Sequence, residues 1–297
     1  MSVCDNCNDR MAIYFRRYSG QRFCGEHFLQ YFENKVRKTI QKYKMIERGD
    51  RLGVAVSGGK DSITTLSILN ELAKKNLEIC AIAVDEGIKG YRSSTIKSAR
   101  SFCSEQNIPL HIVSFRKRFG ATLDKIMRQE KENACTYCGV LRRRLLSEKA
   151  RELSLDKLAT GHNLDDEVQA IMMNYIRGDI GRLLRLGRSV LNKKFIPRIK
   201  PLSEMPEKEV ALYALLRDFE VSFVECPYSL GTFRAGIRDF INELEKNNAG
   251  IKFSILKGYQ KLLPYLELKA AMHECKICGE PTSQKICKTC LLVKMFI

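Results

Sequence analysis

The sequence SGGKDS at 57–62 constrains the fold more than any other stretch of this chain. It follows the apolar segment LGVAVS (52–57), which predicts a short buried strand, and it leads into residues 60–75, where apolar residues recur toward one face of a helix. Glycines at such a turn let the backbone approach a phosphate, and the free N–H groups of the next helix point toward it. The sequence therefore predicts a phosphate-binding turn without the Walker GxxxxGK[ST] pattern, although Asp61 or Ser62 could serve only as a helix cap.

The segments around this turn alternate between strand and helix patterns, which is typical of βαβ units and a parallel sheet. Residues 178–205 are mixed and basic and predict a surface loop. Pro206 suits the first turn of a later helix, where its missing N–H costs nothing. Strands are predicted at 52–57, 77–85, 108–115, 156–162 and 221–229, and helices at 60–75, 93–107, 139–153, 165–177, after Pro206 and onward to about 270.

The chain is strongly basic, with 51 Lys and Arg against 34 Asp and Glu and a net charge of +17. The positive charge is clustered in RKR (116–118), RRR (142–144) and Arg182, Arg185 and Arg188. Such clusters favour a nucleic-acid partner over a merely solvated basic surface. No apolar run reaches the roughly 18 residues of a membrane helix, and the first residues do not resemble a signal peptide. We therefore expect a cytoplasmic protein that does not bind membranes.

Twelve cysteines in such a protein indicate metal binding and not a disulfide scaffold. Two sets of four soft ligands have the spacing of structural zinc sites. They lie in segments of about 30 residues, too short to build cores of their own. The expected units are an N-terminal zinc module (1–30), a catalytic domain with a helical C-terminal part (31–270) and a C-terminal zinc ribbon (271–297). The two ligand sets are Cys4, Cys7, Cys24 and His27, and Cys275, Cys278, Cys287 and Cys290.

Three further cysteines form a different kind of group. Cys135 and Cys138 make a central CxxC, and Cys226 stands before a proline. Cys80 and Cys103 lie in apolar segments and are most simply buried hydrophobic residues. Three thiolates without a fourth ligand can hold a 4Fe–4S cluster with one open iron, but a catalytic disulfide or persulfide pair and a third zinc are alternatives.

A second polar motif, ATGHNLDDEVQ at 159–169, ends a predicted strand and opens a helix. Asp165 and Asp166, together with Asp61, offer the carboxylate oxygens that Mg²⁺ prefers. The alternative is that they only complement the dipole at the helix N-terminus. His162 could act as a general acid or base, contact an adenine ring or simply pack.

These motifs resemble those of a known enzyme family. SGGKDS resembles the PP-loop of adenylating ATP pyrophosphatases, and ATGHNLDDEVQ resembles the HNxDD segment of the branch that thiolates tRNA or forms lysidine. With the order of its cysteine groups, the whole chain resembles the tRNA 2-thiouridine synthetases of the TtuA/NcsA type. The resemblance implies an α/β, parallel-sheet PP-loop core flanked by two zinc modules. It also implies that ATP adenylates the C2 oxygen of a uridine and that sulfur then displaces AMP.

The resemblance assigns roles to individual residues. It favours the 4Fe–4S cluster at Cys135, Cys138 and Cys226, with the open iron binding the sulfur to be transferred. Asp166 is the favoured catalytic residue, and Asp165, Arg142 and Lys60 are further catalytic candidates. The implied ATP contacts are Ala55, Val56, Ser57, Gly58, Gly59, Lys60, Asp61, Ser62, Ala83, Arg142, Gly161 and His162.

Several arginines are candidates for tRNA contact. Arg142, Arg143 and Arg144 point in different directions around one helix, so one could bind phosphate and the others tRNA. Arg234 and Arg238, one helical turn apart, either face tRNA near Cys226 or form a solvated surface.

The expected cofactors and substrates are ATP, Mg²⁺, one 4Fe–4S cluster and two Zn²⁺. The expected partners are tRNA and a sulfur donor, either a ubiquitin-like thiocarboxylate protein or inorganic sulfide, and a homodimer is the expected assembly. A tRNA 2-thiocytidine synthetase and a non-catalytic zinc-finger RNA-binding protein are the alternative functions.

Overall fold

A five-stranded parallel sheet lies at the centre of the computed structural model, which describes residues 2–73, 77–129, 134–186, 196–222, 224, 226–229, 231–265 and 273–296. The strand order is β5–β4–β3–β6–β7, and each neighbouring pair is parallel. The predicted parallel α/β fold is therefore confirmed. The strands are β3 (Arg51–Val56), β4 (Glu78–Asp85), β5 (Leu110–Ser114), β6 (Lys157–Thr160) and β7 (Arg198–Ile199).

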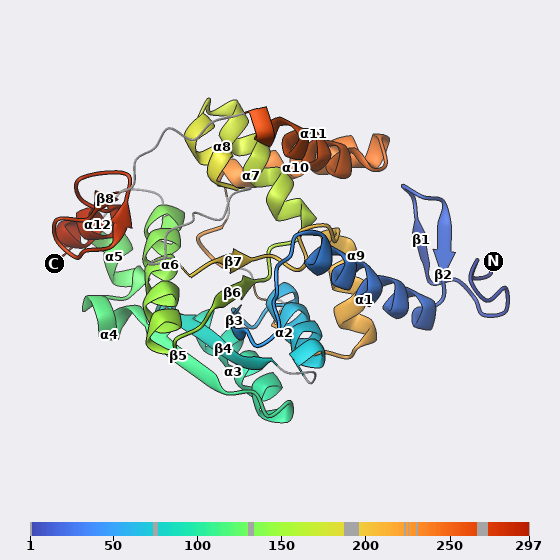
Figure 1. Ribbon diagram of the computed structural model, residues 1–297, viewed down its shortest axis with the longest axis horizontal. Helices are drawn as coiled ribbons and strands as arrows, with labels where there is room; N and C mark the ends of the chain where they lie inside the picture. The colour runs from blue at the N-terminus through green and yellow to red at the C-terminus, as the bar shows by residue number, and fades with distance from the viewer. Residues whose placement is uncertain are drawn as a thin grey trace.

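Helices cover both faces of this sheet (Figure 1). Along β4, Ala81 and Ala83 enter one hydrophobic core while Ile82 and Val84 enter the other, as the two-residue period of a strand requires. A parallel sheet buried on both faces has nearly continuous apolar strands, which is why these segments were readable from sequence. The first core packs against α1 (Gly25–Lys42), α2 (Lys60–Ala73), α3 (Arg92–Glu105) and α9 (Glu207–Leu216), and the second against α4 (Phe115–Phe119), α5 (Leu123–Gln129), α6 (Ala134–Glu152) and α12 (Lys288–Phe296).

A third core belongs to a separate group of helices beside the sheet (Figure 1). Leu164 and Val168 pack there against Ile237 and Leu256. This group fixes the position of α7, whose first turn carries the HNxDD motif. Its members are α7 (Leu164–Ile176), α8 (Ile180–Leu186), α10 (Phe233–Asn247) and α11 (Ile251–Leu262), with the short 3-10 helix η1 (Leu263–Tyr265) after them.

One loop prediction and one strand prediction were wrong. The predicted surface loop 178–205 contains α8 and β7, and residues 187–195 of it, with Arg188, lie outside the described residues. The strand β7 pairs Arg198 and Ile199 with β6, and two residues are too short to show a strand period. In the predicted strand 221–229, the described residues form no strand and instead cross the sheet edge, where Ser222 N donates to Gly58 O (3.2 Å).

Two helix boundaries also differ from the prediction. The helix predicted at 139–153 begins earlier, at Ala134, so that it includes Cys135 and Cys138. Pro206 is the cap residue of α9 and not its first helical residue. Among the described helices, none combines the length and apolar character that a membrane crossing requires.

The small strands belong to the two cysteine modules, which lie at opposite ends of the molecule (Figure 1). They are β1 (Tyr14–Arg16) and β2 (Gln21–Phe23) near the N-terminus, and β8 (His273–Glu274) and β9 (Pro281–Thr282) near the C-terminus. The N-terminal module is joined to the core through Glu209 of α9, which is fully buried. Its carboxylate accepts hydrogen bonds from the hydroxyls of Tyr14 (3.0 Å), Tyr18 (3.0 Å) and Tyr31 (2.9 Å). A buried carboxylate needs such partners, so the contact fixes this module on α9.

Candidate active site and metal centres

The two polar motifs meet at the point where the chain reverses its direction across the sheet. From β3 the chain continues to β4 and β5 on one side, whereas β6 and β7 lie on the other side of β3. The loops that leave β3 and β6 therefore diverge, and the crevice beyond their carboxyl ends is the usual ligand site of such a sheet. SGGKDS leaves β3 and GHNLDD leaves β6, so the predicted phosphate loop and the predicted acidic motif share this crevice.

The phosphate loop requires its glycines. Gly58 has φ +87°, and a Cβ there would lie 1.8 Å from the carbonyl oxygen of Thr95. A Cβ on Gly161 would lie 2.8 Å from the carbonyl carbon of Asp61, so the loop after β6 packs directly on the first turn of α2. Val56, the last residue of β3, pairs with Ala83 of β4, next to the Ala55–Ile82 pair. The implied ATP contacts Ala55, Val56 and Ala83 therefore lie near the carboxyl ends of these two strands.

The serines of SGGKDS hold the loop in this shape. Ser57 N donates to Ser62 Oγ (3.1 Å), and Ser62 Oγ donates to Gly59 O (3.0 Å). The two hydroxyls also lie 3.1 Å apart. These contacts keep the turn open with its backbone N–H groups at the start of α2, where an anionic group is stabilised.

Lys60 bridges two carboxylates at the start of α2. Its Nζ donates to Asp61 Oδ2 (3.1 Å) and to Glu207 Oε1 (2.8 Å). Burial raises the pKa of Asp61, whereas Lys60 more than offsets the effect of burial on Glu207 and lowers the pKa of that carboxyl. Asn163 Nδ2 also donates to Asp61 Oδ1 (3.0 Å). An arriving phosphate would compete with these carboxylates for Lys60.

The two adjacent aspartates of α7 have different environments. Asp165 is buried, and its carboxylate accepts from Glu207 N (2.8 Å) and from the buried Lys252. Asp166 lines the crevice, where its Oδ1 accepts from Arg234 Nη2 (3.0 Å). Burial raises the pKa of Asp166. Asp166 thus lines the crevice, whereas Asp165, predicted as a further catalytic candidate and Mg²⁺ ligand, is buried beside Lys252.

A cavity of about 250 Å³ lies between these motifs and α10. The predicted pair Arg234 and Arg238 lines it from α10, so both arginines face the crevice and not a separate surface. Arg234 Nε also donates to Gln169 Oε1 (2.8 Å). The cavity is lined by Asp61, Asn163, Asp166, Gln169, Glu207, Ser229, Thr232, Arg234, Ala235 and Arg238.

His162 lies beside the crevice as a neutral imidazole. Its side chain is exposed at the surface. Partial desolvation, together with the charges of Lys200 and Arg234, lowers the pKa of His162 to about 4. The Thr160 hydroxyl lies 2.8 Å from its Nδ1. Among the roles considered, a hydrogen bond to a ligand or packing suits this ring better than donation of a proton at neutral pH.

Cys135, Cys138 and Cys226 come together at the start of α6. Cys135 Sγ contacts Tyr228 O (3.8 Å), and Cys226 packs on the same core as Cys138. Their charges act on one another, while burial raises the pKa of Cys138 to about 11 and raises that of Cys226. The three sulfurs do not all lie within 4.8 Å of one another. Their arrangement is compatible with the 4Fe–4S cluster that the sequence predicts.

A chain of ion pairs around the buried Glu86 connects these cysteines to the phosphate loop. Glu86 is 1% exposed and pairs with Arg92 Nε (2.7 Å) and Arg142 Nε (2.7 Å). Arg92 donates to Ser57 O (2.9 Å) in the loop, and Arg142 Nη2 donates to Cys138 Sγ (3.0 Å). Burial acts to lower the pKa of Arg142, but Glu86 raises it above its usual range. The phosphate loop and the cysteine group are thus parts of one site.

Known proteins resemble this chain over nearly its whole length. Residues 29–243 match the PP-loop domain family, and residues 3–29 match the N-terminal LIM domain of the 2-thiouridine synthetase TtuA. The tRNA 2-thiolation protein NcsA of Haloferax volcanii is 35% identical over 98% of each chain. This chain belongs to the PP-loop family of NcsA/TtuA tRNA 2-thiolation proteins.

Other family members support the same relationship. The U34-tRNA thiolase NcsA of Methanococcus maripaludis, solved with its [4Fe-4S] cluster, has a TM-score of 0.88 and 41% identity, covering 98% of this chain and 95% of that one. A probable sulfurtransferase of Methanocaldococcus jannaschii is 41% identical over 94% of this chain and 84% of its own length. The Aspergillus niger cytoplasmic tRNA 2-thiolation protein 1 is 37% identical over 99% of this chain and 88% of its own length.

Both predicted four-ligand sets of this NcsA/TtuA family member are assembled. In each set, all four ligand atoms lie within 4.8 Å of one another. Cys278 Sγ and Cys287 Sγ are 3.7 Å apart, close to the roughly 3.8 Å that tetrahedral zinc requires. Cys287 N donates to Cys275 Sγ (3.2 Å), and this hydrogen bond lowers the pKa of Cys275 to about 6. Both sets fit a structural zinc ion.

The three consecutive arginines of α6 differ in role. Arg142 joins the ion-pair chain, and Arg143 is exposed. Arg144 instead pairs with Glu148 Oε1 (2.6 Å) and Glu280 Oε1 (3.2 Å) and donates to Cys278 Sγ (3.6 Å). The side chain of Arg144 therefore holds the C-terminal module on the core, and its contact with tRNA stays a prediction.

Sequence reasoning missed Glu86, Arg92, Asn163 and Glu207 in this NcsA/TtuA site. Asn163 had a detectable signal, because it stands directly before a helix and forms a capping box with Asp166. Glu207, in the first turn after Pro206, looks like an ordinary helix-dipole residue. Glu86 and Arg92 gave no signal, since only the fold brings them to Arg142.

Proposed function

We propose that this protein is an ATP-dependent tRNA 2-thiolation enzyme that converts a uridine to 2-thiouridine. The observation that carries the proposal is the direct link from the phosphate loop through Arg92, Glu86 and Arg142 to Cys138. It joins a nucleotide site and a sulfur-handling site within one crevice. The names of the relatives, which include thiolation proteins and a thiolase with a 4Fe–4S cluster, support the same activity.

The first step is adenylation. The C2 oxygen of the uridine attacks the α-phosphorus of ATP, and pyrophosphate leaves. Lys60 and the N–H groups at the start of α2 hold the departing phosphates, where negative charge develops. Asp61 and Asp166 would hold Mg²⁺, which offsets the charge on the pyrophosphate when it is bound. The step turns a poor leaving group, the C2 oxygen, into AMP.

The second step is sulfur transfer. A sulfur nucleophile attacks C2, the C2–oxygen bond breaks, and AMP leaves with the original oxygen. Cys135, Cys138 and Cys226 would hold a 4Fe–4S cluster, which supplies an iron without a protein thiolate for the incoming sulfur. Arg142 lies beside Cys138 with its side chain 45% exposed, so it can contact the nucleotide without leaving Glu86. The sulfur donor is a ubiquitin-like thiocarboxylate protein or inorganic sulfide.

The remaining features fit a cytoplasmic enzyme that acts on tRNA. The net charge of +17 favours a polyanionic substrate. We propose three units, a zinc module at 1–30, the catalytic domain at 31–270 and a zinc ribbon at 271–297, with one zinc in each module and a homodimer as the assembly.

The test is thiolation of purified tRNA under anaerobic conditions, with each sulfur donor supplied separately and the nucleosides identified by mass. We expect 2-thiouridine to form only with ATP and cluster-loaded protein. Lys60→Ala should lower adenylation at least about 100-fold, because it removes a charge on the leaving phosphates, while tRNA binding persists. Formation of 2-thiocytidine would establish the alternative synthetase, and tRNA binding without any ATP-dependent product would contradict the enzyme.

Replacement of the cluster cysteines tests the sulfur site. Cys135→Ser, Cys138→Ser or Cys226→Ser should each lose iron and thiolation together, because an open iron leaves only three protein ligands. Zinc content should stay unchanged, since no zinc ligand is altered. Cys103→Ser is the control, because that thiol is buried in α3 away from the site and should keep its iron. Full activity of iron-free protein would exclude the cluster and make Cys226 a candidate sulfur carrier.

A further inference from the structure

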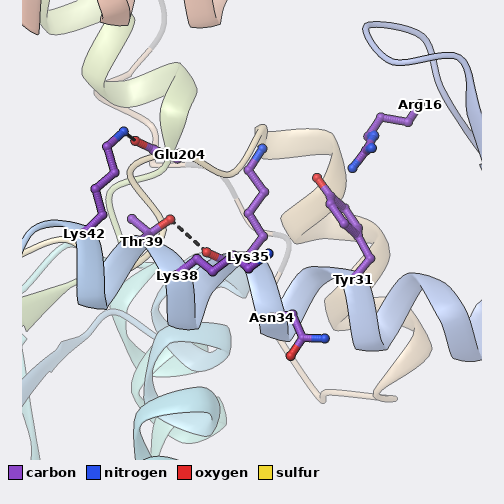
Figure 2. A pocket seen from close by; sticks show the side chains of 8 residues that line it. All are labelled: Arg16, Tyr31, Asn34, Lys35, Lys38, Thr39, Lys42 and Glu204. Carbon is purple, nitrogen blue, oxygen red and sulfur yellow. Dashed lines mark hydrogen bonds and ion pairs between the residues drawn. The ribbon is translucent and has the colours of Figure 1, made fainter.

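A second cavity, outside the catalytic crevice, lies along α1 and holds about 410 Å³. Figure 2 shows the side chains that line it, most of them on one face of that helix. We call this cavity the α1 groove. Its lining residues are Arg16, Tyr31, Asn34, Lys35, Lys38, Thr39, Lys42 and Glu204.

The α1 groove carries an excess of positive charge. Four of its side chains are cationic and one, Glu204, is acidic, and Glu204 already pairs with Lys42. Within the described part of the chain, Lys35 and Lys38 have no carboxylate within 4.0 Å. Burial lowers the pKa of Lys35, whose Nζ lies 4.5 Å from the centre of the Phe253 ring. Partly dehydrated cations without carboxylates favour a bound anion.

One end of the groove is rigid and aromatic. The Arg16 guanidinium lies over the Tyr31 ring, 4.4 Å from its centre. The Tyr31 hydroxyl is fixed in turn by Glu209 (2.9 Å). Nε and Nη2 of Arg16 donate to Ser19 and Gln21, which further fixes the guanidinium. A flat cation held on a fixed ring offers positive charge and a stacking surface, a combination that proteins use on phosphates and unpaired bases.

The lysines of the groove have a regular spacing. Lys35, Lys38 and Lys42 follow one another at three and four residues, which places them about 4.5 and 6 Å apart along the helix axis. Successive phosphates of an RNA strand have a similar separation. We propose that the α1 groove binds the sugar–phosphate backbone of the tRNA substrate, an inference that rests on the proposed thiolation function.

The groove opens next to the catalytic crevice. Glu204 lines the groove and Glu207 lines the crevice, three residues further along the chain. The intervening Met205 accepts a hydrogen bond at its carbonyl oxygen from Leu164 N (2.9 Å), at the start of α7. An RNA strand held along α1 is therefore led to the side of Lys60 and Asp166. An acidic protein fits less well, because the regular spacing of Lys35, Lys38 and Lys42 matches that of successive phosphates.

Charge neutralisation tests this assignment. The triple variant Lys35→Gln, Lys38→Gln and Lys42→Gln is compared with Lys97→Gln, Arg100→Gln and Lys125→Gln, which removes the same charge from exposed positions on α3 and α5. The probe is an unmodified, fluorescently labelled tRNA transcript, titrated at several salt concentrations. We expect the groove variant to lose roughly tenfold or more in affinity, with a salt slope reduced by about 2 to 3. The affinity of the α3/α5 control variant for tRNA should change less than about threefold.

Activity separates this inference from the function on which it rests. The groove variant should show a raised KM for tRNA with kcat and the KM for ATP unchanged, because it leaves the crevice intact. Lys38→Gln alone should also raise the KM for tRNA, and it does not risk the folding of the protein because Lys38 is exposed. Unchanged tRNA affinity in both groove variants would overturn the proposal, and so would weaker binding of polyglutamate with unchanged tRNA binding. Wild-type protein that binds tRNA through the groove but forms no thiolated product would contradict only the proposed function.

Discussion

At the scale of single residues, neighbours in sequence can have different environments in the structure. Asp165 and Asp166 share one motif, but successive positions on a helix point about 100° apart. Asp165 therefore turns into the protein, where Lys252 neutralises it, and Asp166 turns toward the crevice. A pair of carboxylates in sequence is thus one structural and one functional side chain in space.

This difference predicts opposite effects of two matched substitutions. Asp166→Asn should lower adenylation at least about 100-fold with little loss of stability, because its ion pair with Arg234 is partly exposed. Asp165→Asn should lower the free energy of unfolding by about 3 to 5 kcal/mol, because it leaves Lys252 buried without its counter-charge. Kinetics and chemical denaturation of both variants check this. Full stability with lost catalysis in Asp165→Asn would contradict the assignment.

His162 predicts a dependence of stability on pH. Its folded pKa of about 4 lies below the ordinary 6.5, so the unfolded chain binds more protons in that interval. The folded protein should therefore lose stability as the pH falls from about 6.5 to 4, and the loss should level off below that. Since the ring is partly exposed, the contribution should be no more than about 1 kcal/mol. His162→Gln should remove this slope in denaturation curves, and an identical slope in both proteins would exclude His162 as its source.

At the scale of elements, α6 joins three parts of the molecule. Its first turn carries Cys135 and Cys138, Arg142 reaches Glu86, and Arg144 holds the C-terminal module. Because one rigid helix fixes all three, the geometry of the sulfur site is coupled to the packing of the zinc ribbon. The arginine cluster is therefore a structural connection and not one uniform basic surface.

Removal of one of these arginines should loosen the ribbon selectively. Arg144→Ala should cost about 1 to 3 kcal/mol locally, because it leaves Glu280 without one of its partners in a site 18% exposed. Amide hydrogen exchange should become faster in residues 273–296, while the phosphate loop keeps its protection. Arg143→Ala, the exposed neighbour, is the control and should leave the exchange rates unchanged. Equal amide exchange rates in both variants would contradict the role of Arg144 in holding the C-terminal module on the core.

At the scale of the whole molecule, small metal modules occupy both ends of a large core (Figure 1). Each module is too short to bury much apolar surface, and its four ligands could bind a metal that would supply the stability a core would otherwise give. The modules nevertheless contact the catalytic domain through Glu209 on one side and Arg144 on the other. Metal loading and the arrangement of the active site are thus connected.

Metal analysis checks this arrangement. Aerobically purified protein should contain two zinc ions per chain, because each four-ligand set is complete and does not need iron chemistry. Cys278→Ser should lose one zinc and keep the other, which assigns each ion to its module. Fewer than about one zinc per chain in the wild-type protein would contradict the structural role of both sets.

The sequence by itself determined the features that depend on nearby residues. Short spacings between residues predict the phosphate loop and the two zinc ligand sets. Periods of two and 3.6 residues predict the alternation of buried strands with helices. The tertiary structure decided the rest. Lys60 meets Glu207 at a separation of 147 residues, Arg144 meets Cys278 at 134, and Lys252 meets Asp165 at 87. No local period encodes such contacts, because they form only when the sheet order brings distant segments together.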